Sequence, residues 1–228
     1  MTNASMAIDV YQRIRSLIVD GTFSPGHRLV EAELIAALGA GRSYVREALS
    51  RLEYDGLVEK NSGCSSVVRY VPKSELLEIL DARISLEAIA VRAAALSRTA
   101  QQAVRMRDLA KEIEVAADQG DLGAVTRAQA AFHHALLEAS GLPAIRRMIS
   151  NLTALTAQTR SRTMLLPGRV RTSASDHRAV AKAILAGDPE TAERAMIHHL
   201  VGVKNAIGQL PSTAMRPLRL AASRRSSA

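Results

Sequence analysis

The chain has 228 residues, of which 47% are hydrophobic, 23% charged and 3% aromatic, and its formal net charge is +8. This composition is too apolar for a disordered chain, and no apolar run reaches the roughly 18 residues of a membrane-spanning helix. A single Cys excludes a disulfide framework and a thiolate zinc site, and the first residues lack the pattern of a signal peptide. We therefore expect a cytoplasmic protein of one or two domains with no membrane contact.

The positive charge does not identify a part of the chain that binds nucleic acid. Residues 1–71 hold eight basic and eight acidic side chains, residues 72–210 hold eighteen and fourteen, and residues 211–228 hold four and none. The excess is therefore shared between the middle and the C-terminal end. Local arrangement rather than bulk charge must decide where nucleic acid would bind.

Residues 5–71 have the pattern of a small mixed domain. Apolar side chains at helical spacing predict helices around 11–18, 34–38 and 42–54, each followed by a glycine within three residues. Two β-rich runs, 57–60 and 66–70, flank an Asn-Ser-Gly sequence and predict a hairpin. Three helices followed by a two-stranded wing is the order of a winged helix-turn-helix domain.

From residue 72 the chain becomes rich in Ala and Leu and predicts an all-helical bundle, so the fold class is mainly α. Gly120-Asp121 and Gly187-Asp188 each pair a helix-ending glycine with an Asp suited to cap the next helix. Residues 211–228 have little periodicity and predict a disordered basic tail. The helices that we expect in residues 72–210 cover 73–98, 101–119, 121–140, 142–164, 172–186 and 188–208.

Segment 42–49 carries the residues best suited to contact DNA. In a helix-turn-helix domain the second helix enters the major groove with its N-terminal residues directed at the base edges. Arg42 and Arg46 are four residues apart, so they share a helix face, and Arg can pair bidentately with guanine. Ser43 and Tyr44 carry hydroxyl groups suited to phosphates. The alternative is that both arginines only solvate an exposed helix face.

Four motifs follow one another in residues 21–59. They are a Pro-Gly turn, a Leu-x-Glu-x-x-Leu helix, an Arg-x-x-Val-Arg-Glu-Ala-Leu segment and a Leu-Glu-x-x-Gly-Leu-Val exit. In order and spacing they resemble the DNA-binding domain of the GntR family of bacterial transcription regulators. The resemblance implies that Arg42 and Arg46 contact bases and that Gly63 lies at a wing tip near the minor groove. It also implies a homodimer on a palindromic DNA operator.

Three of the six histidines fall on three separate expected helices, an arrangement that can hold a metal in a bundle core. A lone helical His is more often a hydrogen-bonded polar residue, so spacing alone leaves the metal open. Segments in residues 72–210 resemble the effector-binding (FCD) domain of the FadR subgroup of GntR regulators. The matching motifs are Arg83-x-x-x-Glu87, Phe132-His133, Ala139-Ser140-Gly141, Asp176-His177, Ala183-Ile184 with Gly187-Asp188, and His199-Leu200.

This second resemblance implies a divalent metal held by one Asp and three His, with a carboxylate effector at its open positions. The histidines correspond to His133, His177 and His199, whereas the Asp position is Gln129 in this chain. Three neutral imidazoles suit zinc or nickel, and a neutral amide is a weaker ligand than a carboxylate for a hard cation. The resemblance also implies that Arg83 contacts an anionic effector, although a helix salt bridge to Glu87 explains the same pair.

We therefore expect a transcription regulator, not an enzyme, whose operator binding responds to a small carboxylate or sugar-acid metabolite. Two alternatives remain open at this point. The first is a metal-dependent hydrolase that uses the three-His site to activate water. The second is a non-sensing architectural DNA-binding protein that uses the basic tail.

Overall fold

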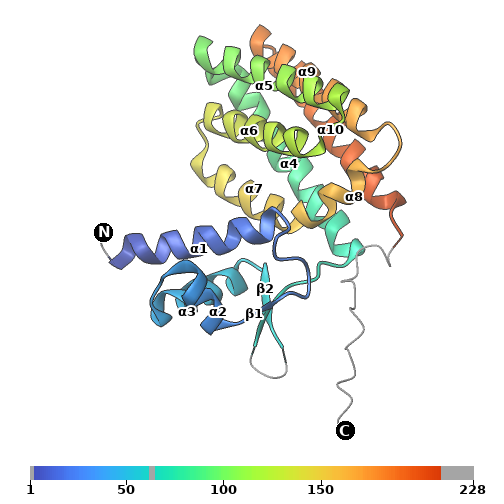
Figure 1. Cartoon of the computed structure of the whole chain (residues 1–228). Coiled ribbons are helices and arrows are strands. Elements are labelled where there is room, and N and C mark those ends of the chain that lie inside the picture. The colour runs from blue at the N-terminus through green and yellow to red at the C-terminus, as the bar shows by residue number, and fades with distance from the viewer. Residues whose placement is uncertain (1–2, 62–64, 212–228) are drawn as a thin grey trace. The chain divides into compact units, whose positions relative to one another are not determined.

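The computed structural model describes residues 3–61 and 65–211, which form two compact units (Figure 1). The first unit includes the residues up to Pro72, and the second spans Lys73–Leu210. Except for Pro211, the expected tail lies outside the described residues. The elements of the first unit are α1 (Asn3–Val19), β1 (Arg28–Leu29), α2 (Glu31–Leu38), α3 (Arg42–Tyr54), β2 (Val58–Lys60) and β3 (Ser66–Val68).

The first unit is a small helical core with a three-stranded sheet at its side. Helix α1 packs against α3, and Ile14, Val45 and Leu52 are completely buried between them and their neighbours. Gly39 ends α2 in the left-handed conformation, with φ of 61°, which a side chain with a Cβ rarely adopts. The turn between α2 and α3 is therefore short. This arrangement confirms the expected winged helix-turn-helix fold.

The sheet has one strand more than the sequence predicted. Strand β1 pairs antiparallel with β3, which also pairs antiparallel with β2, so the strand order is β1-β3-β2. Arg28 and Leu29 form only two residues of strand, too few for an alternating pattern to be recognised. Leu29 is nonetheless buried, and this burial ties the strand to the core.

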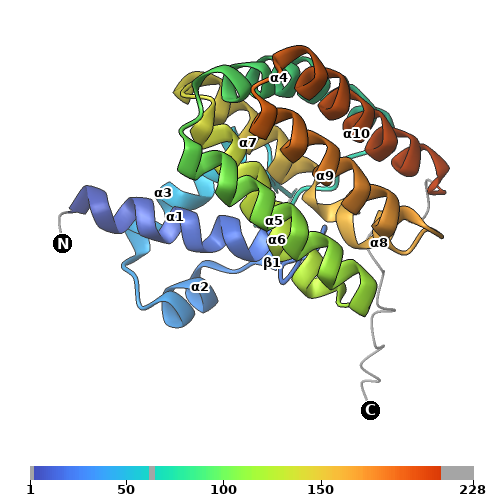
Figure 2. The same ribbon diagram turned by 90° about the horizontal axis from the view of Figure 1, so that it is seen from above.

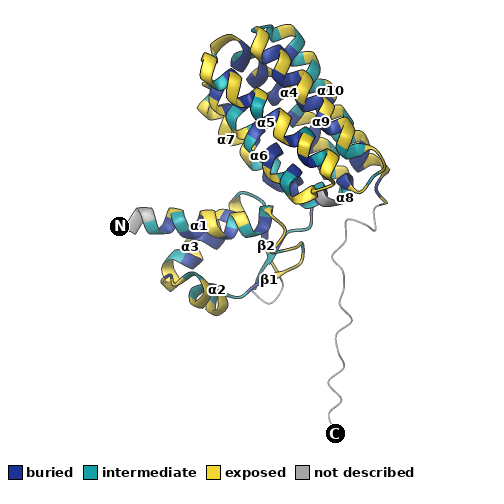
Figure 3. Ribbon diagram, turned by 45° about the horizontal axis from the view of Figure 1, so that its top comes forward, coloured by how far each residue is buried: buried dark blue, intermediate teal, exposed yellow. Residues whose placement is uncertain are grey.

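The second unit is an all-helical bundle, as expected. Helix α4 contacts α10, α6, α7 and α9, while α5 lies beside α6 and α9, as both Figure 1 and Figure 2 show. Figure 3 shows the buried residues lining the inner sides of these helices. The elements are α4 (Lys73–Ser97), α5 (Ala100–Gln119), α6 (Leu122–Ala139), α7 (Pro143–Thr156), the 3₁₀ turn η1 (Ala157–Thr159), α8 (Arg160–Met164), α9 (Arg169–Ala186) and α10 (Pro189–Gln209).

The two predicted Asp caps are confirmed. The Asp121 carboxylate accepts a hydrogen bond from the backbone N–H of Ala124, and the Asp188 carboxylate accepts one from Thr191. Each cap satisfies a backbone donor that has no partner inside its helix. These caps fix where α6 and α10 begin, and both helices carry a histidine of the site described below. Within the described residues, no helix has the length and apolar character needed to span a membrane.

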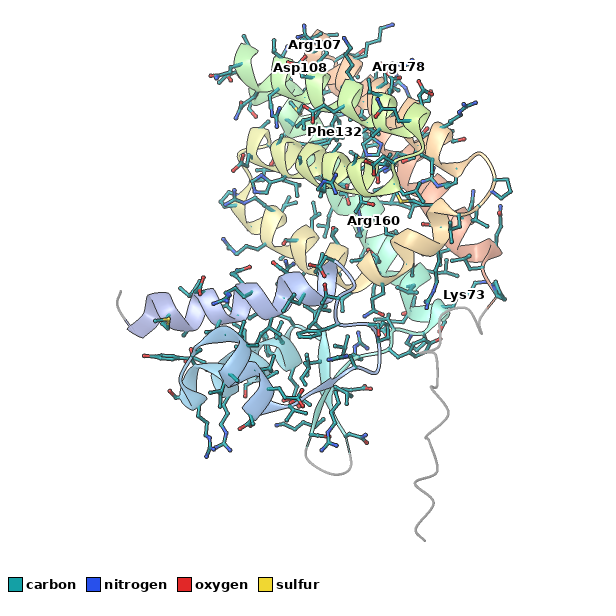
Figure 4. All side chains as sticks on the ribbon, in the orientation of Figure 1. Lys73, Arg107, Asp108, Phe132, Arg160 and Arg178 are labelled. Atoms are coloured by element: carbon teal, nitrogen blue, oxygen red, sulfur yellow. The ribbon has the colours of Figure 1, made fainter. Side chains whose placement is uncertain are left out.

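The single helix predicted over 142–164 was wrong. Helix α7 ends at Thr156, a 3₁₀ turn follows, and α8 begins at Arg160. Thr156 and Thr159 donate their hydroxyl groups to the carbonyls of Thr153 and Thr156, which gives the backbone an alternative to continued helix. The break matters for the site because it directs Arg160 toward the inner side of the bundle, where Figure 4 shows it.

Candidate functional site

The N-terminal end of α3 presents polar side chains on the opposite face from its core contacts. The helix begins at Arg42, immediately after Gly41, and residues Arg42, Ser43 and Arg46 are exposed while Tyr44 is half-buried. This end of a helix also attracts anions, because its first backbone N–H groups lack helical partners. The residues that hold the other face against the core are Val45, Ala48, Leu49 and Leu52.

Arg46 is engaged by a carboxylate of the neighbouring helix. Its Nε lies 3.1 Å from Oε1 and 3.0 Å from Oε2 of Glu31, the first residue of α2. The Arg46 side chain remains 63% exposed and that of Glu31 39% exposed. The guanidinium is therefore anchored at one edge while most of it stays accessible.

Three histidines meet inside the helical unit, each from a different helix. His133 comes from α6, His177 from α9 and His199 from α10, and one ring nitrogen from each lies within 4.8 Å of the others. His177 is 2% exposed and His199 5% exposed, whereas His133 is partly accessible. Phe132, which Figure 4 labels, packs edge-on against both His133 and His177.

The partner of His177 fixes its tautomer. Its Nδ1 lies 2.6 Å from the backbone carbonyl oxygen of Ser173, and a carbonyl can only accept a hydrogen bond. The proton is therefore on Nδ1, and Nε2 carries a lone pair. That Nε2 is buried without a hydrogen-bond partner among the described residues. A buried lone pair with no donor is the condition that a metal ligand requires.

The other two imidazoles are oriented in the same way by carboxylates. His199 Nδ1 lies 3.3 Å from Oδ2 of Asp176, and His133 Nδ1 lies 3.4 Å from Oε2 of Glu87. Because ionised carboxylates only accept, all three imidazoles can direct Nε2 at a common point. Burial lowers the pKa of His199 well below the usual value, and the neighbouring His133 adds to this effect. Burial also lowers the pKa of His177, which keeps both rings neutral.

Three arginines lie near the histidines, of which Arg83 is buried and Arg160 and Arg169 are partly buried. Arg83 donates from Nε and Nη2 to Oε1 of Glu87, at 2.9 and 2.7 Å, and from Nη1 to the Thr156 hydroxyl at 3.0 Å. Burial alone would raise the pKa of the Glu87 carboxyl, but Arg83 and His133 outweigh this effect and hold it well below its usual range. The Glu87 carboxylate is thus ionised and bridges an arginine and a histidine.

Two further arginines have positive charge that the described residues do not fully balance. Burial lowers the pKa of Arg160, and repulsion by Arg83 adds to the effect. Arg169, at the start of α9, lies 3.8 Å from Asp176, and its Nη1 is buried without a hydrogen-bond partner in the described part of the chain. Such groups attract an anion, because a buried guanidinium needs acceptors for its N–H groups.

Comparisons with known proteins agree with both parts of this description. Residues 7–68 match the bacterial regulatory proteins of the gntR family, and residues 78–202 match the FCD domain. The chain belongs to the GntR family of regulators that carry an FCD domain. Sequence relatives of this GntR-family chain include the transcriptional regulator LutR of Bacillus subtilis (strain 168), which is 28% identical over 212 residues, covering 84% of this chain and 96% of LutR.

A second relative is known both as a sequence and as a structure. The transcriptional regulator McbR of Escherichia coli (strain K12) is 28% identical over 152 residues, covering 67% of this GntR-family chain and 69% of McbR. The solved structure of E. coli McbR/YncC is similar with a TM-score of 0.81 and 23% identity, covering 92% of this chain and 99% of that one. The structural likeness shows a shared fold.

Within the FCD domain, the structure brings together several of the predicted site residues. The three predicted histidines converge, and Arg83 and Gln129 lie among the buried residues of the same unit. Gln129 donates from Nε2 to the Ser173 hydroxyl at 3.0 Å. Gly63 lies outside the described residues. His134 and His198 are exposed, and Nε2 of His198 lies 3.7 Å from Oδ1 of Asp176.

Sequence reasoning missed Arg160 and Arg169 in the FCD domain, and it missed the orienting roles of Ser173 and Asp176. No spacing signal marks the arginines, because the sequence predicts one helix over 142–164, which includes α8, and a helix that begins only at residue 172 in place of α9. The role of Asp176 has no local signal either, because it faces His199 on another helix and not the adjacent His177.

Proposed function

We propose that this GntR-family transcription regulator reads a palindromic operator with Arg42, Ser43, Tyr44 and Arg46, and that Gly63 of the wing approaches the minor groove. The observation that carries the proposal is the exposed polar face at the N-terminal end of α3, opposite a fully packed apolar face. A helix placed in this way fits the major groove, where Arg can pair with guanine. Because palindromic half-sites match a twofold axis, we also propose a homodimer.

The test is the double variant Arg42→Ala with Arg46→Ala. We expect it to lose selective binding to a palindromic duplex chosen from a random pool by the wild-type protein, measured by fluorescence anisotropy. The charge-matched control is Arg105→Ala with Arg107→Ala, two exposed arginines on α5. If the double variant kept its sequence preference, the proposed contacts would be wrong. Binding that is sequence-independent and lost on deleting residues 211–228 would instead favour an architectural protein.

We further propose that the FCD domain holds a divalent metal through Nε2 of His133, His177 and His199. Each Nδ1 faces an acceptor, which leaves three neutral nitrogens for one ion, and the unpartnered Nε2 of His177 is the observation that carries this proposal. Three imidazoles favour zinc or nickel over hard cations. Such a metal would supply open coordination positions to a carboxylate group.

Metal analysis of the purified protein tests this proposal. After treatment with a chelator and reloading with Zn²⁺ or Ni²⁺, elemental analysis is expected to find about one ion per chain, as three histidines in one cluster imply. His177→Ala is expected to remove it. His134→Ala is the matched control, because His134 adjoins a proposed ligand in sequence but is exposed and faces Glu138. Equal metal content in the two variants would refute the three-His site.

The effector that we propose is a small carboxylate or sugar acid that contacts Arg83 and the partly buried Arg160. Arg83 uses three of its five N–H donors on Glu87 and Thr156, so two remain for an anion. Arg160, beside it, adds positive charge. A thermal-shift screen of carboxylates with and without metal tests the effector class. A ligand present at about 100 times its Kd stabilises the folded state by about 2.7 kcal/mol. Stabilisation by neutral sugars alone would contradict this proposal.

A further inference from the structure

Glu31 is the only described carboxylate that pairs with one of the proposed base-contacting arginines. Both of its oxygens approach the same atom, Nε of Arg46, at 3.1 and 3.0 Å. The two residues belong to different helices, with Glu31 on the first turn of α2 and Arg46 on the second turn of α3. The contact therefore crosses between the two helices of the helix-turn-helix.

The geometry leaves the outer edge of the guanidinium available. Guanine presents O6 and N7 side by side in the major groove, and Arg pairs with both through two parallel N–H groups. Because Glu31 occupies Nε, the Nη1 and Nη2 groups remain available for such a pair. A free arginine must also lose side-chain rotamer freedom when it binds, and a carboxylate that already restrains its plane reduces that loss.

We infer that Glu31 is a positioning residue that orients Arg46 toward a guanine edge and thereby sets the sequence preference of the regulator. This inference rests on the proposed base contact of Arg46. It extends the contact to Glu31, a residue on another helix. A carboxylate beside a phosphate backbone repels it, so Glu31 weakens general DNA binding while it strengthens discrimination.

These two effects have opposite signs, and this separates positioning from a general charge effect. Glu31→Gln is expected to bind a scrambled duplex more tightly than the wild type, because a negative charge is lost. It is also expected to lower the ratio of operator to scrambled affinity by about three- to tenfold, a part of what one bidentate guanine contact contributes. A residue that only contributed charge would change both affinities together and leave the ratio constant.

The chain offers two matched controls. Glu33 lies in the same first turn of α2 and is exposed, so Glu33→Gln removes the same charge without touching Arg46. Glu31→Asp keeps the charge but shortens the side chain by one methylene. We expect Glu33→Gln to raise both affinities and preserve the ratio. Glu31→Asp is expected to lower the ratio while leaving the affinity for the scrambled duplex near that of the wild type.

The experiment uses the full chain and a duplex selected from a random pool by the wild-type protein, with each guanine replaced in turn. Affinities are measured by anisotropy at three salt concentrations, and circular dichroism verifies folding. If Arg46→Ala retains the wild-type ratio of operator to scrambled affinity, the proposed base contact itself is wrong. If Arg46→Ala lowers the ratio but Glu31→Gln behaves like Glu33→Gln, only the positioning role is overturned. Support requires that adding Glu31→Gln to Arg46→Ala cause no further loss of the ratio.

Discussion

Replacement of Glu87 by Gln in the metal-free protein is a direct test of the electrostatics of the buried site. Gln has nearly the shape of Glu but no charge. The variant would leave the Arg83 guanidinium buried, with the Thr156 hydroxyl as its remaining strong partner at 3.0 Å. It would also remove the charged acceptor that faces Nδ1 of His133. The folded state therefore loses far more than one surface contact.

The free-energy cost of breaking the Arg83–Glu87 pair depends on how deeply the pair is buried. An exposed pair at this i, i+4 spacing contributes about 0.5 kcal/mol or less, which is the value that the sequence alone would predict. The side chains of Arg83 and Glu87 are 9% and 1% exposed, so breaking the pair is expected to cost about 3–5 kcal/mol. The double variant Arg83→Met with Glu87→Leu removes both charges together. It is expected to cost less than the single variant.

The distribution of aromatic residues allows the unfolding of the two units to be followed by different spectroscopic signals. The chain has no Trp, and all four Tyr lie in residues 1–72, so tyrosine fluorescence reports the first unit while far-UV circular dichroism mainly follows the helical bundle. In urea, Glu87→Gln should lower the dichroism midpoint by about 2 M at an m value of about 2 kcal/mol/M. The fluorescence midpoint should not change. A loss below about 0.5 kcal/mol, or a double variant as unstable as the single one, would refute the reasoning.

Three further predictions concern other parts of the chain. Tyr11→Phe removes a hydrogen bond to Asp55 at 2.5 Å and is expected to destabilise the first unit by about 1–2 kcal/mol in urea. Burial raises the pKa of Tyr11, and the bond to Asp55 adds to it, so this stabilisation is present below about pH 10 and is lost as the pH rises through the raised pKa. Gln129→Asp is expected to tighten Zn²⁺ binding about tenfold by calorimetry, and unchanged affinity would mean that residue 129 does not act on the metal. Phe132→Ala, at a completely buried position, is expected to cost about 3–5 kcal/mol in the dichroism transition, whereas a loss near zero would show that the core closes around the gap.

The sequence predicts the elements well where strong local signals coincide. Helix α3 spans Arg42–Tyr54 as expected, because glycines lie just outside both ends and the buried residues recur at helical spacing. Strand β1 and the break after Thr156 were missed for a different physical reason. The pairing of β1 with β3 joins distant residues, which no window of local sequence contains. The break combines the local hydroxyl bonds of Thr156 and Thr159 with a hydrogen bond from the distant Arg83, and only the local part lies within reach of sequence reasoning.

Some features of the candidate site can likewise be predicted from the sequence, and others cannot. The resemblance to the FadR subgroup names the three histidines, and the structure brings them together. Which ring nitrogen faces the cluster depends on Ser173, Asp176 and Glu87, and the two carboxylates come from other helices than the histidines that they face, so no sequence spacing relates them. The sequence also could not distinguish an exposed Arg83–Glu87 pair from a buried one. That distinction changes the expected energy by several kcal/mol.

Gln129 forms a hydrogen bond inside the bundle, so its effect on folding can be considered apart from its effect on the proposed metal site. Its amide donates to the Ser173 hydroxyl, and the Ser173 carbonyl accepts from His177, so one serine links the substituted position to a proposed ligand. A carboxylate at position 129 would accept from that hydroxyl instead, because a serine hydroxyl can donate as well as accept. The Ser173 hydroxyl therefore suits the chemistry of either residue, although Asp is one methylene shorter than Gln. The exchange of Asp for Gln should leave the fold intact and act on the metal, through the loss of one negative charge.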